Sequence, residues 1–322
     1  MKLTTLRGAM AALLLGIVAS ASAQNYPAGP IRIIVPFPAG GGVDTAGRLL
    51  GQKLSEAIGR PVLIDNRAGA NGMIGSEMVA KAPKDGYTLM VNGANFVTSP
   101  TLYAKSLYDP IKDFDAISLL AHAPNILVVH PSMPVKSVRE LIAFAKARPG
   151  EVLFAGSGSG STPHLAGELF KTQTGTKMVH VPYRGTGPAI TAILSGEVGS
   201  MFMPALTALP LIQSGRVRAL GVTSLERLPA LPDLPTVSES GLKGYQSSQW
   251  YGVLAPAGTS PDILNLLNGH AVKIMQSADM KERMKNSGSV AVGSSREVFA
   301  KFLQTEYSKW AQVIKASGAT VD

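Results

Sequence analysis

The sequence of 322 residues contains no cysteine. Disulfide bonds, thiolate metal sites and cysteine nucleophiles are therefore excluded, and so is a lipid anchor attached to cysteine. Such a chain is stabilised by its hydrophobic core alone, and roughly 300 residues suffice for this, most simply as two domains. After the leader described below, the chain also lacks any segment that is apolar and long enough to be a membrane helix.

Dense runs of basic residues are missing as well. The chain carries 30 Lys and Arg against 21 Asp and Glu, a formal charge of +9, but the basic residues are scattered and are not interleaved with aromatic ones. This distribution argues against nucleic-acid binding. A basic exported protein favours anionic small molecules, although a generally basic solvated surface explains the charge more simply.

The N-terminus has the composition of a secretory leader, with two cations near the start, an apolar stretch over residues 8–19 and the small residues Ala21-Ser22-Ala23. We expect a cleavable signal peptide over residues 1–23, a mature chain that begins near Gln24 and a location in the periplasm. The alternative is a retained N-terminal anchor. Cleavage removes two of the 30 cationic residues and leaves a charge of +7.

Strands and helices are predicted to alternate. Residues 31–35 form an apolar run typical of a buried strand, and residues 44–58 have the spacing of an amphipathic helix closed by Gly59. The same order recurs after Pro134, which predicts an α/β fold with parallel sheets and right-handed crossovers. Further predicted strands lie at 62–64, within DGYTLMVNG, at 152–155, 178–181, 198–203 and 219–223, and within WYGVLAPAGTSP; further helices end before Pro83, follow Ser137 and begin at Pro188, and cover residues 165–174, 261–275 and 295–316.

Two glycine-rich loops join a strand to a helix, PFPAGGGVD at residues 36–44 and AGSGSGSTPH at residues 155–164. A helix that follows such a loop leaves free N–H groups at its start, where the macrodipole adds positive charge. Both loops are therefore candidates for anion binding at the carboxyl ends of strands. The alternative is that the glycines only allow tight turns. The second loop adds hydroxyl groups that can donate to a carboxylate, those of Ser157, Ser159, Ser161 and Thr162.

Known loop signatures fail residue by residue. A dinucleotide fingerprint requires glycine where Thr45 stands in the first loop and Ser161 in the second. Neither loop has the lysine of a nucleoside-triphosphate loop. A hydrolase elbow requires serine where Gly158 stands. We therefore expect no cofactor.

Two polar residues follow these loops. Asp44 stands in the first turn of a helix, where it either complements the dipole or orders the loop. His164 and Glu168 are four residues apart on one helix face, but no third ligand has a convincing spacing, so we expect no metal site. His164 more simply orients its loop or contacts a ligand. The other histidines are expected to be structural, namely His122, His130, His180 and His270.

Several motifs, taken in order, resemble one family. VPFPAGGGVDTAGRLL, GYTLMVNG, YDPIKDFDAISLLA, HLAGELF, HVPYRGTGPAI and RALGVTSLERLPALPDLPTVSESG together resemble the Bug family, the extracytoplasmic solute receptors of tripartite tricarboxylate transporters. The resemblance covers essentially the whole mature chain. It implies a two-lobed type II periplasmic-binding-protein fold with a ligand cleft between the lobes. Residues 24–124 and 247–322 are expected in the first lobe and residues 125–246 in the second.

The resemblance also implies a function. The protein is expected to bind a small organic carboxylate, a dicarboxylate or an aromatic carboxylate, by lobe closure and to deliver it to the permease subunits of a tripartite tricarboxylate transporter. It is expected to be a monomer and to perform no catalysis. Two other functions stay open, a ligand receptor for a membrane sensor kinase and a secreted serine hydrolase.

Site residues follow from the same resemblance. In such receptors the first-lobe loop holds a carboxylate through main-chain amides and ordered waters, and hydroxyl-rich loops of the second lobe hold the rest of the ligand. Carried over to this chain, the expected contacts are Phe37, Ala39, Gly40, Gly41, Asp44, Asn95, Ser157, Ser161, Thr162, His164, Tyr183 and Arg184.

One departure from the family pattern concerns residues 198–203. Many relatives have V-D-x-M-F-D where this chain has V-G-S-M-F-M, so that Gly199 and Met203 replace two acidic residues. The change is either packing drift or a pocket that has become more apolar, with Met203 as a ligand contact. The second interpretation disfavours an ammonium group, which would find no carboxylate partner, and favours a second carboxylate or an aromatic body.

Overall fold

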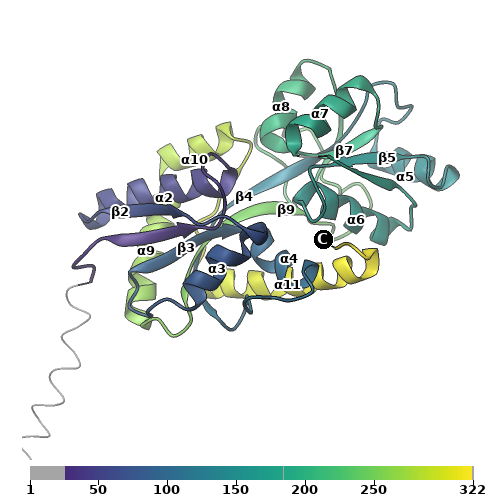
Figure 1. Ribbon diagram of the computed structural model, residues 1–322. Coiled ribbons are helices and arrows are strands. Elements are labelled where there is room, and N and C mark those ends of the chain that lie inside the picture. Colours follow the sequence, from purple (N-terminus) through teal and green to yellow (C-terminus); the bar gives the residue numbers. More distant parts are fainter. Residues whose placement is uncertain (1–25, 184, 321–322) are drawn as a thin grey trace, which may run out of the picture.

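The structure is a computed structural model that describes residues 26–183 and 185–320. The chain forms two α/β lobes side by side, and a long C-terminal helix runs beneath both (Figure 1). The signal peptide predicted over residues 1–23 lies outside the described residues. Within the described ranges, no helix combines the length and the apolar character needed to cross a membrane.

The helices and strands fall into three groups. The first lobe contains β1 (Ile31–Val35), α2 (Gly42–Ile58), β2 (Val62–Asn66), the 3-10 helix η1 (Ala70–Gly72), α3 (Met73–Ala80), β3 (Thr88–Gly93), α4 (Asn95–Leu102), α9 (Pro261–Gln276), α10 (Ala278–Asn286) and β10 (Val290–Ala291). The second lobe contains α5 (Val138–Ala147), β5 (Leu153–Gly156), α6 (Thr162–Thr174), β6 (Val179–Pro182), α7 (Thr186–Ser195), β7 (Ser200–Pro204), α8 (Ala205–Gln213) and β8 (Arg218–Val222). The lobes are connected by β4 (Phe114–Val129), β9 (Ser248–Pro256) and α11 (Arg296–Ser317).

A mixed sheet runs through the molecule in the order β2-β1-β3-β9-β4-β7-β5-β6, with β8 and β10 paired to β4. Its outer parts are parallel, β1 with β2 and β3, and β5 with β6 and β7. The central strands β4 and β9 are antiparallel to each other and to their neighbours. The prediction of parallel pairing came from the alternation of strands and helices, and it agrees with these outer parts. The antiparallel pairing of β4 and β9 was not predicted.

The long strand β4 passes from one lobe to the other near its middle. Pro124 pairs with Ser248 of β9, and the next residue, Asn125, pairs with Pro204 of β7. The lobe boundaries expected from the sequence, 24–124, 125–246 and 247–322, remain a prediction.

The start of α2 is placed by its packing on β1. Every residue of IRIIV except Arg32 is buried, as expected for a strand covered on both faces. Gly47 lets the helix approach the strand, because a Cβ there would lie 2.9 Å from the Val35 side chain. Gly59 ends the helix in the left-handed region with φ 65°. The N-terminus of α2 therefore lies at the carboxyl end of β1.

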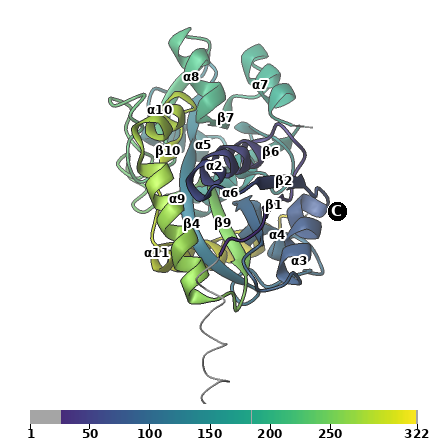
Figure 2. The same cartoon turned by 90° about the vertical axis from the view of Figure 1, so that its left-hand side faces the viewer.

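The hydrophobic core differs on the two sides of the sheet. On one side a single cluster runs through both lobes along α11, from Phe96 to Phe154 and Phe202. On the other side α2, α9 and α10 cover a first-lobe cluster, whereas α7 and α8 cover a separate second-lobe cluster. Figure 2 shows α9 and α3 on opposite sides of the first-lobe sheet. The lobes thus share a core on the α11 side and have separate cores on the other.

Candidate functional site

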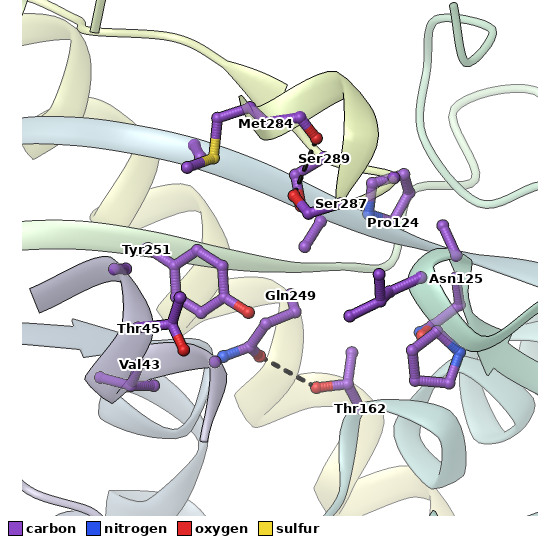
Figure 3. Close-up of a pocket in the computed structure, with 18 of the residues that line it drawn as sticks. Val43, Thr45, Pro124, Asn125, Thr162, Gln249, Tyr251, Met284, Ser287 and Ser289 are labelled. Atoms are coloured by element: carbon purple, nitrogen blue, oxygen red, sulfur yellow. Dashed lines mark hydrogen bonds between the residues drawn. The ribbon is translucent and has the colours of Figure 1, made fainter. Parts of the chain in front are cut away.

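A cavity of about 750 Å³ lies between the lobes. Its size falls in the range of small-molecule sites. Both lobes and both connecting strands contribute to its wall, and Figure 3 shows part of the lining. The polar part of the lining includes Gly40, Thr45, Asn71, Asn95, Asn125, Ser157, Ser159, Ser161, Thr162, Thr186, Thr207, Gln249, Tyr251, Arg283, Ser287 and Ser289.

The first-lobe loop is held by Asp44, which is 2 % exposed. The Gly40 N–H donates to Asp44 Oδ2 at 2.8 Å, Arg48 Nε donates to the same oxygen at 2.9 Å, and Asn66 Nδ2 donates to Oδ1 at 2.9 Å. The bond from Arg48 is the main reason why the pKa of Asp44 is lowered to about 2, with the bonds from Gly40 and Asn66 adding to it against the opposing effect of burial. Asp44 therefore orders the loop.

The free end of α2 faces the cavity. Gly41 is the N-cap and provides no side-chain cap, and Gly42 and Val43 line the cavity. The first N–H groups of a helix have no acceptor within it, and the dipole makes this end positive. Gly42 lies against Tyr251, since a Cβ built on Gly42 would lie 2.2 Å from the tyrosine hydroxyl oxygen. The bare backbone of the loop is needed for this close approach.

The second-lobe loop is held in the same way by His164. The Gly160 N–H donates to His164 Nδ1 at 3.0 Å, and the ring stacks on His180 with centroids 3.8 Å apart. Burial, followed by the neighbouring His180 and Lys171, lowers the pKa of His164 to about 3, so that the imidazole is neutral at pH 7. In each lobe a loop glycine thus donates its N–H to a side chain four residues later, a carboxylate in one lobe and an imidazole in the other.

Further helix starts surround the cavity. Asn95 begins α4 and donates to Asn71 Oδ1 at 2.7 Å. Thr186 begins α7, and Ala205 begins α8. Ser161 caps α6, and the Thr162 hydroxyl donates to Gln249 Oε1 of β9 at 3.1 Å (Figure 3). Residues at all of these helix starts line the cavity, which gives it positive potential without a cluster of basic side chains.

The charges of the lining residues also favour the binding of an anion. Among the lining residues in the described part of the chain there is no Asp or Glu, and Arg283 is the one charged residue. Arg283 Nε donates to Asp279 at 2.9 Å at the exposed end of α10. The cavity therefore favours an anion over a cation.

The predicted contacts divide into two sets. Gly40, Asn95, Ser157, Ser161 and Thr162 line the cavity. Arg184 lies outside the described residues. The others do not line it, namely Phe37, Ala39, Gly41, Asp44, His164, Tyr183 and Met203.

Several residues of the second set have other contacts instead. Met203 is fully buried in the second-lobe core, because strand alternation turns its side chain away from the cavity that Pro204 lines. Gly199 packs against Met133, so both positions agree with the packing alternative, and a ligand contact by Met203 stays a prediction. Tyr183 donates its hydroxyl to Glu197 at 2.7 Å, and burial together with Glu197 raises its pKa to about 12. The Phe37 ring lies against Gly72.

Sequence reasoning missed Asn125 on β4, Gln249 on β9 and the contribution of α10. Asn125, Gln249 and Tyr251 line the floor of the cavity from β4 and β9, and Arg283 and Ser287 line it from α10 and its end. Alternation in SQWYG could have indicated that Gln249 and Tyr251 share one face. The pairing of their strand was not predicted, and so the direction of that face was unknown.

The geometry supports neither a metal site nor a serine hydrolase. Glu168 accepts from Lys171 at 2.8 Å, while His164 Nε2 lies 3.8 Å away from it. No group of three or more potential metal-binding side chains occurs within residues 26–183 and 185–320. The acceptor nitrogen of His164 is already bonded to the loop backbone, so it is not placed to act as a base for a serine.

Two lobes around an anion-favouring cavity define a solute-binding protein. A family model described as the tripartite tricarboxylate transporter family receptor matches residues 46–319, and the chain belongs to this family. BugT of Bordetella pertussis is 38% identical over 306 residues, 94% of each chain. The predicted resemblance to the Bug family and the predicted two-lobed fold are thereby confirmed.

Solved structures of similar proteins carry small acids. The R. palustris protein Rpa4515, solved with adipate, has 36% identity and a TM-score of 0.76, covering 92% of this chain and 99% of its own. MatC from Rhodopseudomonas palustris, solved with bound malate, has 31% identity and a TM-score of 0.73, covering 90% of this chain and 100% of its own. Both ligands are dicarboxylates.

Proposed function

We propose that this protein is a periplasmic receptor that captures a small organic dicarboxylate in the interlobe cavity and delivers it to a tripartite tricarboxylate transporter. The observation that carries the proposal is the lining itself. Helix starts from both lobes face a cavity whose described lining contains no carboxylate. Positive helix ends hold anions in a water-accessible cleft without a compensating cation.

In the proposed mode of binding, each lobe offers main-chain amides. The start of α2 presents Gly42 and Val43, and the loop before α6 presents Ser157 and Ser161 with their hydroxyl groups. Adipate and malate in the similar proteins support a ligand with two carboxylates. Arg184 stays a proposed contact from the loop before α7.

The proposed mechanism is lobe closure without chemistry. The shared core along α11 keeps the lobes together on one side, whereas the cavity separates them on the other. A ligand that contacts both lobes binds the closed state more tightly and shifts the population toward it. The closed receptor is then the form that a permease would recognise. Export through a leader at residues 1–23 and a monomeric state complete the proposal.

We expect the cavity to reject amino acids, for a reason other than the one given by the sequence at residues 199 and 203. Since Met203 lies in the core, the loss of acidic residues at 199 and 203 does not explain it. The described lining nevertheless offers no carboxylate to pair with an ammonium group, and burying that cation unpaired is costly.

Native mass spectrometry of the freshly purified receptor, followed by calorimetry and thermal melting with mono-, di- and tricarboxylates and amino acids, tests the proposed function. We expect a co-purified or added dicarboxylate to bind and to stabilise the protein by about 2.7 kcal/mol at a hundredfold excess over Kd. Binding of amino acids with no response to any carboxylate would contradict the proposal. So would turnover of an ester or amide that is lost on Ser157→Ala.

A further inference from the structure

An unsatisfied amide lies in the floor of the cavity. Asn125 is 1 % exposed, and its Nδ2 is buried without a hydrogen-bond partner among the described residues. Other side-chain atoms share this property, but within the described part of the chain Asn125 is the only residue among them that also lines the cavity. Native proteins rarely leave a buried donor unpaired, so we expect this amide to have an acceptor that the described residues do not provide.

The main chain of Asn125 is already satisfied. Its N–H donates to Thr223 Oγ1 at 2.9 Å, and its carbonyl accepts from the Thr223 N–H and hydroxyl, both at 3.0 Å. The residue is thus fixed on β4 at the point where the strand passes between the lobes. These bonds fix the main chain, and none of them uses the side-chain amide.

The start of α8 lies beside this amide. Asn125 is the cross-strand partner of Pro204, which is the N-cap of α8 and provides no side-chain cap. Ala205, Leu206 and Thr207 follow as the first turn and line the same cavity. Their N–H groups have no acceptor within the helix, and the dipole makes this end positive. Asn125, labelled in Figure 3, and the first turn of α8 therefore belong to the same part of the cavity wall.

We infer that Asn125 and the first turn of α8 form a second acceptor subsite, which binds the distal carboxylate of the ligand. The inference rests on the proposed function, in which the first carboxylate lies at the start of α2. A neutral amide that can only donate through Nδ2 suits an anion, whereas a methyl group would leave the amide buried and unpaired. Asn125 thus selects dicarboxylates over monocarboxylates of the same length.

Calorimetry with two matched pairs of acids, succinate with butyrate and adipate with hexanoate, tests the inference. We expect the wild-type protein to bind at least one diacid more tightly than its monoacid. Asn125→Asp places a carboxylate opposite the distal group and should weaken diacid binding about tenfold or more, with monoacid binding unchanged within about twofold. Asn125→Ala should weaken diacid binding less, and it provides the test if Asn125→Asp does not fold. Asn265→Asp adds the same charge on α9, outside the lining, and should change neither.

The melting temperature of the ligand-free protein separates a binding role from a structural one. Because the amide has no partner within residues 26–183 and 185–320, Asn125→Ala should lower it little, while the shift produced by the diacid should shrink. An unchanged preference for diacids in both variants, or a wild-type protein without that preference, overturns the inference and leaves the proposed function intact. A wild-type protein that binds none of the four acids contradicts the proposed function, and the inference falls with it.

Discussion

At the scale of single residues, each of the two glycine loops is held by one acceptor side chain, and the two side chains differ in chemistry. Asp44 and His164 each accept an N–H from a glycine four residues earlier. A carboxylate next to an anion site is unfavourable, but Arg48 and Asn66 bind Asp44, and the carboxylate is turned away from the cavity lining. The neutral imidazole of His164 needs no such compensation. Both residues thus hold their loops and do not line the cavity.

Replacement of Asp44 by asparagine measures the strength of this support. Asn keeps the shape but loses the charge that three donors share, so we expect the free energy of unfolding at pH 7 to fall by about 1–3 kcal/mol. The folded-state pKa of about 2 lies below the ordinary value of 3.8, so the ionised carboxylate stabilises the fold above pH 4 and this contribution is lost as the pH falls toward 2. Urea denaturation measures the free energy of unfolding at pH 7 and at pH 3. Its decrease between these two pH values should be smaller for Asp44→Asn than for the wild type.

Asp262→Asn provides the control for that measurement. Asp262 also lies in the first turn of a helix, α9, but it is exposed. If the helix dipole alone explained the role of Asp44, both variants would lose the same few tenths of a kcal/mol. An equal loss would contradict the loop-ordering role.

At the scale of helices and strands, the sequence predicted the elements whose pattern is uniform. β1 is an unbroken apolar run, and α2 has one apolar face and a glycine at its end, so both were predicted almost to the residue. β4 was missed. Its 16 residues change surroundings at Pro124, and neither a continuous apolar run nor a clean alternation continues across that point. α10 was missed because its nine residues are mostly polar.

In the candidate site, the parts with a local sequence signal were predicted and the parts formed by distant segments were not. Both glycine loops were found, because a strand, a glycine run and a helix pattern are local signals. The start of α6 was placed at Leu165, whereas the helix begins at Thr162, since the N-cap Ser161 stands within a run of small polar residues. The floor of the cavity was not predictable, because Asn125 and Gln249 are brought together by antiparallel pairing across more than a hundred residues of sequence.

Close packing at the start of α2 gives an element-scale prediction. In Gly42→Ala the new Cβ would lie 2.2 Å from the Tyr251 hydroxyl and 3.1 Å from Cζ, so the start of α2 or the Tyr251 side chain must shift. Such overpacking typically costs about 1–3 kcal/mol of unfolding free energy, and the displaced amides should bind carboxylate about tenfold more weakly. Chemical denaturation and calorimetry measure the two effects.

Two further variants show whether the contact itself is the cause. Tyr251→Phe removes the hydroxyl, so the double variant should recover most of the loss in a double-mutant cycle. Gly41→Ala is the matched control, because its Cβ would meet only the Pro38 carbonyl at 3.8 Å. Equal losses from Gly41→Ala and Gly42→Ala would show that loop flexibility, and not the approach to Tyr251, explains the effect.

At the scale of the whole molecule, three imidazoles on two parts of the structure are neutral because they are buried. Burial lowers the pKa of His122 on β4 to about 4, of His164 on α6 to about 3 and of His180 on β6 to about 4, with a neighbouring Lys adding to each shift. In the unfolded chain all three return to about 6.5 and bind protons first. The contribution of these neutral histidines to the free energy of unfolding is therefore fully present above pH 6.5, and it is lost as the pH falls from 6.5 toward 4.

Replacement of one of these histidines should flatten that dependence. In His122→Phe the aromatic contact with Phe302 can persist, and one proton that the unfolded chain would bind is gone. The slope of unfolding free energy against pH, measured by urea denaturation between pH 6 and pH 4.5, should then fall by up to about 1.4 kcal/mol per pH unit. An identical slope in His122→Phe and the wild type would mean that His122 takes up its proton without unfolding, through an opening of the α11 side that both lobes share.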